Sequence, residues 1–210
     1  MEDFESKVSL KDGMDEQDES VQSNAIILLL RDFLLIQHRR ALAYSNLKRG
    51  FTEYVASGDE FAYQQICSGI SAEFNECSKA VIEMESELKR QNREDLAHLL
   101  RNVQTQEKEK LHLTATIQVL KKAGRPSERP VSHGSCKFRA SMEHECANVH
   151  EITEASGTED AEADAEYDNA LNEAIRGVQC AVTIINEQLE EVNYEIAALG
   201  SDVASGSRSS

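Results

Sequence analysis

Residues 26–55 decide the fold, and they read IILLLRDFLLIQHRRALAYSNLKRGFTEYV. At about 100° per residue, one stripe of a helix carries a mostly apolar set: Ile26, Leu30, Phe33, Gln37, Ala41, Tyr44, Lys48, Phe51 and Val55. A second row on roughly the opposite side consists of Leu28, Leu35 and Leu42. A helix with two apolar sides is expected to have neighbours on both. We therefore expect a helix over residues 22–56 at the centre of the fold.

The spacing of apolar residues predicts three more helices. Residues 60–90 follow the cap residues Gly58 and Asp59 and repeat apolar side chains every three or four positions. The next helix is predicted to begin after Asn92, as its N-cap, and to stop at Gly124. The last, over residues 163–199, keeps the same spacing. The expected fold class is all-α: an antiparallel bundle of three long helices plus a fourth, coiled-coil-like C-terminal helix, with disordered tails and linker.

Changes in composition divide the chain further. Residues 1–20 are predicted to be a disordered acidic tail, and residues 21–124 a three-helix core. Residues 125–160 carry Cys and His without a sustained apolar period, which is typical of a flexible linker. Residues 161–199 hold the long C-terminal helix, and residues 200–210 a disordered tail. The linker lets this last helix pack on the second apolar side of residues 22–56 or pair with a second copy of the chain.

The charge balance argues against strong direct binding to nucleic acid. The net charge is −16 and the pI about 4.8, whereas DNA binding requires Lys and Arg against phosphates. Taking Arg31 as 0°, the basic residues of the first helix scatter to about 0°, 80°, 180°, −100° and 0° for Arg31, Arg39, Arg40, Lys48 and Arg49. This scatter is typical of solubilising residues around a mostly buried helix.

The sequence also argues against a membrane or secreted protein. Arg31 and Asp32 interrupt the apolar run before it reaches the length of a membrane span. The residues that follow Met1 resemble no signal peptide, and five cysteines then suggest free thiols in a reducing compartment. The nucleus and the cytoplasm are both compatible with this pattern.

No catalytic or cofactor motif is recognisable, so neither an enzyme nor a cofactor is expected. Glu109-x2-His112 and Asp95-x2-His98 have a metal-binding spacing, but both lie on one predicted helix and are read as surface residues. A zinc site is the alternative to a plain linker at His133, Cys136, Cys146 and His150, although the order of these ligands is unusual. Cys67, Cys77 and Cys180 are expected to be core residues.

Several motifs over about residues 30–124 resemble the required-for-excision B family of DNA-repair proteins. The first corner carries Leu47-x2-Gly50-x3-Tyr54-x2-Ser57-Gly58, followed by Phe61 and Tyr63. The second predicted helix carries Phe74-x3-Ser78-x2-Val81-x3-Glu85-x-Glu87-Leu88. The third carries Arg101-x2-Gln104-x2-Glu107-x3-Leu111 and Gln118. The resemblance implies a part in DNA excision repair and favours the nucleus, but it carries over no active-site motif.

Two function classes follow from these observations. The first is a noncatalytic helical adaptor or scaffold that acts through protein partners of a repair complex. The alternative is a general coiled-coil assembly subunit, cytoskeletal or trafficking, unrelated to repair. The expected partner-binding surface is the first corner, with exposed Arg49 and Glu53 as the contact residues, beside Leu47, Gly50, Tyr54 and Phe61. Packing of the turn is the competing role for Leu47, Tyr54 and Phe61.

Overall fold

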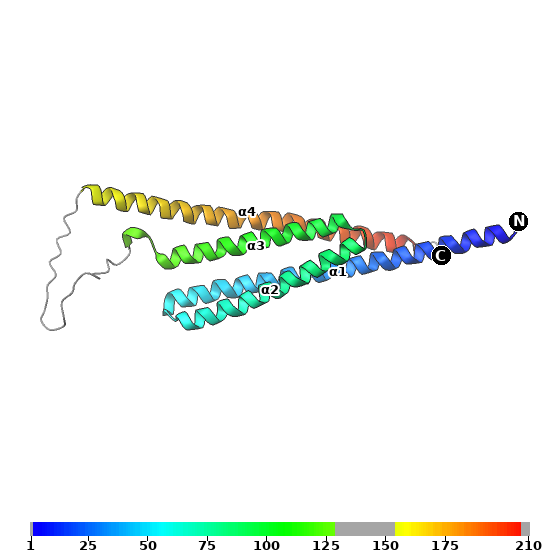
Figure 1. Ribbon diagram of the computed structural model, residues 1–210, viewed down its shortest axis with the longest axis horizontal. Coiled ribbons are helices and arrows are strands. Elements are labelled where there is room, and N and C mark those ends of the chain that lie inside the picture. The colour runs from blue at the N-terminus through cyan, green and yellow to red at the C-terminus, as the bar shows by residue number, and fades with distance from the viewer. Residues whose placement is uncertain (1, 129–153, 207–210) are drawn as a thin grey trace. The chain divides into compact units, whose positions relative to one another are not determined.

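The protein is all-helical in the part of the chain that its structure describes, as the sequence predicts. The structure, a computed structural model, describes the backbone of residues 2–128 and 154–206 and the side chains of residues 21–128 and 158–201. Its elements are α1 (Glu2–Ser57), α2 (Glu60–Arg90), α3 (Glu94–Ala123), the 3-10 turn η1 (Pro126–Glu128) and α4 (Glu154–Gly206) (Figure 1). They form two compact units, Met1–Lys110 with Cys180–Ser210, and Leu111–Gln179.

The turn between α1 and α2 has the predicted cap chemistry. Gly58 has a φ of 75°, which suits glycine, and its N–H donates to the carbonyl of Tyr54 at 2.8 Å. The Asp59 carboxylate then accepts from the N–H of Ala62 at 3.0 Å, so that Asp59 is the N-cap of α2. These two residues let α2 begin immediately and run back along α1.

The turn between α2 and α3 differs from the prediction, because Asn92 closes α2 instead of capping α3. Asn92 has a φ of 57° and donates its N–H to the carbonyl of Lys89 at 3.1 Å. The N–H of Arg93 reaches the carbonyl of Leu88 at 2.9 Å, and this pair of bonds is a Schellman motif. Asparagine can serve at either helix end, so the sequence alone did not decide between the two roles.

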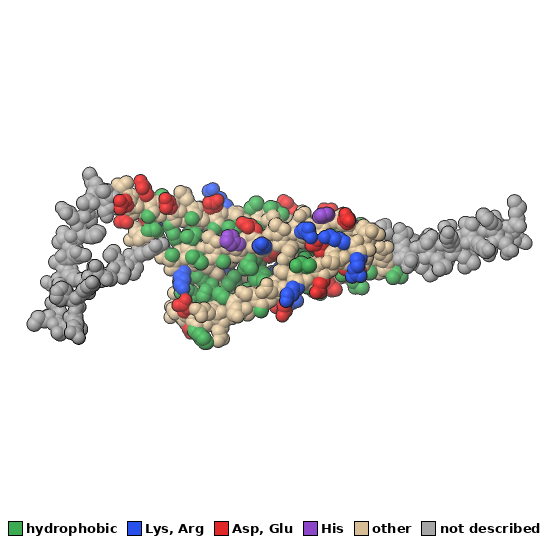
Figure 2. Space-filling view, in the orientation of Figure 1, with side chains coloured by type: hydrophobic (Ala, Val, Ile, Leu, Met, Phe, Trp, Pro, Cys, Tyr) green, Lys and Arg blue, Asp and Glu red, His purple; other side chains and the backbone are tan. Residues whose placement is uncertain are grey.

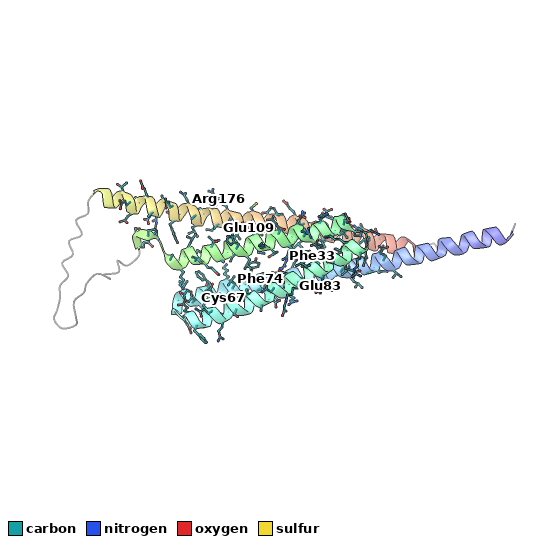
Figure 3. The ribbon with its side chains drawn as sticks, viewed as in Figure 1. Phe33, Cys67, Phe74, Glu83, Glu109 and Arg176 are labelled. Carbon is teal, nitrogen blue, oxygen red and sulfur yellow. The ribbon has the colours of Figure 1, made fainter. Side chains whose placement is uncertain are left out.

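The core of the first unit draws on all four helices. Leu30 and Phe33 of α1 are fully buried, and Phe33 is labelled in Figure 3. The core cluster comprises Ile26, Leu30, Phe33, Ile36, Cys77, Val81, Leu88, Leu96, Ala97, Leu100, Val103, Ile185 and Val192. Since Ile185 and Val192 belong to α4, the C-terminal half of that helix packs within the same chain.

The second apolar row of α1 is not buried, which corrects the expectation of neighbours on both sides. Leu28, Leu35 and Leu42 are 61%, 63% and 53% exposed. Helical periodicity shows that this row shares a face, but it does not show whether another element covers that face. In the described residues α1 therefore borders the core instead of lying at its centre.

The second unit joins the end of α3 to the first half of α4. Arg125 contacts Asp164 at 3.4 Å and Asp168 at 2.5 Å, while Ser127 donates from both N–H and hydroxyl to Asp164. Gly177 has no side chain where Leu113 approaches, since an added Cβ would lie 2.6 Å from Leu113 Cδ1. Part of the predicted linker over 125–160 is thus ordered by contacts to α4.

The helix boundaries also differ from prediction at the two ends of the chain. α4 begins at Glu154, before the predicted start at 161–163, and continues to Gly206. α1 is helical from Glu2, although the side chains of the predicted acidic tail, residues 1–20, lie outside the described set, as does much of the tail at 200–210. The candidate zinc ligands His133, Cys136, Cys146 and His150 fall outside the described residues. No described helix is long and apolar enough to cross a membrane.

Candidate functional site

The α1–α2 corner separates the six predicted partner-binding residues into a packed group and an exposed group. Leu47 is buried, and Gly50 lies where an added Cβ would be 2.8 Å from Ile66 Cδ1. Tyr54 stacks on Tyr63 at 4.9 Å between ring centroids, with the rings inclined by 15°. Leu47, Gly50 and Tyr54 therefore serve to pack the turn.

Phe61 does not pack the turn, because 71% of its surface is exposed. Arg49 and Glu53 are also exposed, with 72% and 65% of their side chains accessible. Arg49 donates to the Asn46 side chain at 3.1 Å and lies only 4.0 Å from Glu53. An exposed ion pair of that length contributes little, so both charges remain available for contacts.

A groove runs between α1 and α2 beside this corner, and Arg49 and Glu53 line it. It has a volume of about 750 Å³. The α1 wall consists of Arg39, Leu42, Ala43, Asn46, Arg49 and Glu53, and the α2 wall of Gln65, Ile66, Gly69, Ile70 and Glu73. The floor is thus aliphatic and the rims are charged, an arrangement typical of a site for a partner side chain or helix.

One rim of the groove is held by ion pairs between the two helices. Arg39 donates from Nε to Glu73 at 2.7 Å and from a terminal nitrogen to Glu76 at 3.3 Å. The hydrogen bond between Arg39 and Glu73 lowers the pKa of the Glu73 carboxyl and raises that of the guanidinium. In the middle of the α2 wall, Gly69 leaves open space, since nothing lies within 4 Å of an added Cβ.

A buried polar layer lies deeper in the same unit, and sequence reasoning missed it. Arg40, which the sequence predicts to be a solubilising surface residue, is 1% exposed. It donates to the side chains of Gln104 and Ser78, and Gln104 in turn donates to the Ser78 hydroxyl at 2.9 Å. The polar layer consists of Gln37, Arg40, Tyr44, Ser78, Gln104, Glu107 and Lys110. It joins α1, α2 and α3.

Tyr44 of α1 connects the polar layer to Glu107 and Lys110 of α3. The Tyr44 hydroxyl donates to the Glu107 carbonyl at 3.1 Å, and Lys110 Nζ lies 4.0 Å above the Tyr44 ring. Lys110 also pairs with the Glu107 carboxylate at 2.9 Å. Burial raises the pKa of Tyr44 and lowers that of Arg40. Burial thus keeps the Tyr44 phenol neutral, while the nearby Glu107 favours the charged form of Arg40 and opposes the effect of burial.

Some buried atoms of the polar layer have no hydrogen-bond partner. They are both amide atoms of Gln37, Nε and one terminal nitrogen of Arg40, and one carboxylate oxygen of Glu107. A layer of this kind costs stability compared with an apolar one, and its best-attested use is to fix the register of helices. A signal was present in the sequence: Ser78, Gln104 and Glu107 are polar residues of the family pattern at positions between apolar seam residues.

The described residues contain no recognisable catalytic or metal-binding arrangement. No group of three or more His, Cys, Asp or Glu side chains in the described ranges could hold a metal ion. Glu109, His112, Asp95 and His98 are all exposed. Cys77 is buried, and burial raises the pKa of its thiol, which disfavours the reactive thiolate. Cys180 is exposed, contrary to the prediction that it is a core residue.

On these features, the protein is a helical bundle with an interhelical groove, a buried polar layer and mixed surface charge. Figure 2 shows Lys and Arg side chains interspersed with Asp and Glu on the visible face. Residues 28–121, just under half of the chain, match the model of the family described as DNA repair REX1-B. This match confirms the resemblance to the required-for-excision B family, and it contains the corner, the groove and the polar layer. Searches of curated proteins and of solved structures gave no match.

Proposed function

We propose that the protein is a noncatalytic adaptor in DNA repair that binds protein partners at the α1–α2 groove. The family match supports a repair role, since its description names DNA repair. The observation that carries the adaptor role is the position of Arg49 and Glu53, which are exposed on the rims of an aliphatic groove inside the matched segment. A groove of this kind suits recognition of a protein segment better than chemistry on a small molecule.

The charge of the chain supports protein partners over direct DNA contact. A net charge of −16 opposes binding to phosphates, and the groove rims carry carboxylates as well as guanidiniums. The buried polar layer links α1 to α2 and α3 by hydrogen bonds, which favours one register of the three helices and a defined spacing of the groove walls. Preorganised walls reduce the entropy lost when a partner binds.

The experiment replaces the endogenous protein with groove variants and measures survival after ultraviolet damage together with co-purifying proteins. Gly69→Trp is expected to fill the groove without unfolding the protein, because open space surrounds Gly69. Arg49→Glu removes one rim contact. Both variants should lower survival and lose the same partner while folded protein remains at the wild-type level. Lys108→Glu, an exposed charge change on α3, is the matched control and should do neither.

The alternative role as a cytoskeletal or trafficking assembly subunit makes the opposite prediction. Cells without the protein would then survive ultraviolet damage normally, and the co-purifying proteins would belong to a filament or a coat. We place the adaptor in the nucleus, where the damaged DNA lies. Imaging of a tagged full chain that is excluded from the nucleus, before and after damage, would count against the repair proposal.

A further inference from the structure

The exposed leucines of α1 continue upstream into a longer row, which we call the leucine face: Val21, Leu28, Leu35 and Leu42. Val21 is 67% exposed and the leucines 53–63%. The members are seven residues apart, so they drift only slowly around the helix, from about 80° at Val21 to about 20° at Leu42 with Arg31 at 0°. Scattered exposed apolar residues are normal, but a continuous row about 30 Å long indicates a binding surface.

Because Arg40 is buried, it is not among the exposed basic residues that surround this row. Without Arg40, Arg31 and Arg49 fall on one line of α1 and Arg39 lies about 80° away, so all three border the leucine face. Arg31 is exposed and has no ion pair among the described residues, and Arg49 has a hydrogen bond to Asn46 and, among those residues, only a 4.0 Å ion pair with Glu53. Arg39, by contrast, is already committed to Glu73 and Glu76 on α2. One edge of the leucine face therefore offers two available guanidiniums.

The leucine face is continuous with the α1–α2 groove. Leu42 belongs to both, and Arg39 and Arg49 line the groove at its rims. A helix laid along α1 would meet Leu28 and Leu35 first and would then place its next turn over the groove. The two surfaces can thus bind one elongated ligand.

We propose that the leucine face docks an amphipathic α-helix of a partner protein, with apolar residues at heptad spacing and acidic residues along the edge that meets Arg31 and Arg49. This inference rests on the proposed function, since it names the class of partner that the adaptor binds. Carboxylates at that edge would pair with guanidiniums that the chain itself leaves available. Leucine packing supplies the affinity, and the charged edge sets the orientation.

A second copy of the chain fits this surface less well. Antiparallel pairing centred on Leu35 would set Arg31 against Arg39 of the second copy, and parallel pairing would set Arg31 against Arg31. Both arrangements bring like charges together at the edge of the contact. Four aliphatic side chains also offer less than the roughly 800 Å² per partner of a stable interface.

The test measures binding of the full chain to two designed 21-residue helical peptides at about 150 mM salt by fluorescence anisotropy. Both peptides carry leucines at heptad spacing, and they differ only in glutamate or lysine at the flanking positions. The glutamate peptide should bind at least ~10-fold more tightly than the lysine peptide. The double change Arg31→Glu and Arg49→Glu should reverse that preference. Leu35→Ser should weaken both peptides ~10-fold or more, whereas Ile82→Ser, at a 55% exposed site on α2, should leave both unchanged.

Several outcomes would overturn the inference. Equal binding of the two peptides, absence of binding, or binding that survives Leu35→Ser would each exclude the acidic-helix partner. Sedimentation equilibrium that shows a dimer lost in Leu35→Ser would assign the face to a second copy. Binding to duplex DNA that the double arginine variant abolishes would assign it to nucleic acid. These measurements do not involve survival after damage. The inference about the acidic helix can therefore fail while the repair role holds, and the repair role can fail while the acidic helix still binds.

Discussion

Arg40 shows how a single residue can change the interpretation of a whole helix. By sequence it is one of five Lys and Arg residues in the stretch 26–55, yet it is buried against Ser78 and Gln104 in the middle of the bundle. Charge is a reliable sign of exposure only when no polar partners are at hand, and here α2 and α3 supply them. Periodicity identifies the helix face of Arg40 but not the chemistry of the facing helices, so the polar layer could not be derived from residues 26–55 alone.

Gly69, which lines the α1–α2 groove, and Gly50, which packs against Ile66, provide a matched pair for a stability prediction. Gly69→Ala should raise the free energy of unfolding by about 0.5–1 kcal/mol, since alanine favours the helix and the new Cβ meets open space. Gly50→Ala should bring no such gain, because its Cβ would lie 2.8 Å from Ile66 Cδ1 and 3.0 Å from Ile66 Cγ2. Chemical denaturation of both variants provides the comparison, and an equal gain in both would contradict the close packing of α1 on α2.

Phe74 and Glu76 test the core against the surface on a single turn of α2. Phe74, labelled in Figure 3, is buried and contacts the Tyr44 ring edge to face at 4.8 Å. Phe74→Ala should therefore cost about 3–5 kcal/mol. Glu76→Ala should cost about 0.5 kcal/mol or less, because its side chain is 69% exposed and its ion pair with Arg39 is solvated. Small and equal losses in urea denaturation would contradict the assigned core.

At the scale of elements, Glu85 joins α2 to α3. Its carboxylate accepts from Lys89 at 2.6 Å and from Arg101 at 2.5 Å. Burial opposes ionisation of Glu85, but these hydrogen bonds outweigh it and hold the pKa of the carboxyl below its ordinary value. A lowered pKa in the folded state means that ionised Glu85 stabilises the fold at neutral pH, and that this contribution is lost as the pH falls through the folded-state pKa.

Glu85→Gln should therefore destabilise the protein at pH 7, on the order of 1 kcal/mol, and the difference from wild type should shrink below about pH 4. Urea denaturation at a series of pH values measures it. Glu83→Gln is the matched control, since Glu83 is exposed on the same helix (labelled in Figure 3) and should show little difference at any pH. A Glu85→Gln effect that stays constant from pH 7 to pH 3 would contradict a stabilising contribution from the ionised carboxylate.

The presence of four helices and the bounds of α2 and α3 were predictable from the sequence, whereas the outer ends of α1 and α4 and the contacts between helices were not. The bounds of α2, Glu60–Arg90, agree with the prediction because Asp59 and Asn92, which end the helix on either side, lie within two residues of its first and last residues. The start of α4 was missed because residues 154–160 combine three acidic residues with Ser, Gly and Thr, a composition that is compatible with a solvated helix or a loop. Arg49 and Glu53 were correctly expected to be exposed, but the groove that they line requires both helices in place.

At the scale of the whole molecule, the charge predicts how the protein meets DNA. With a net charge of −16, purified full chain should show no appreciable binding to duplex DNA at about 150 mM salt. Fluorescence anisotropy with a labelled duplex measures this directly. Submicromolar binding that Arg49→Glu abolishes would favour direct DNA contact over an adaptor role.

The last prediction concerns α4, which either packs on its own chain or pairs with a second copy. Val192 is fully buried in the core cluster of the first unit, and Glu195 one turn away pairs with Arg93 at 2.8 Å. Both contacts lie within one chain, so folding should be unimolecular. The thermal midpoint should therefore stay constant over a 100-fold range of protein concentration, whereas pairing of α4 between two chains would make it rise with concentration.

Two variants of α4 test whether Val192 packs in the core of its own chain or against a second copy. Val192→Ala removes buried methyl groups and should lower the free energy of unfolding by about 1–3 kcal/mol, while Tyr194→Ala, at a 70% exposed site, should change it little. If α4 instead packed on a second copy, Val192→Ala would mainly shift the monomer–dimer equilibrium, and its effect would fade at low protein concentration. A loss of stability that is the same at all concentrations requires the C-terminal helix to complete the core of its own chain.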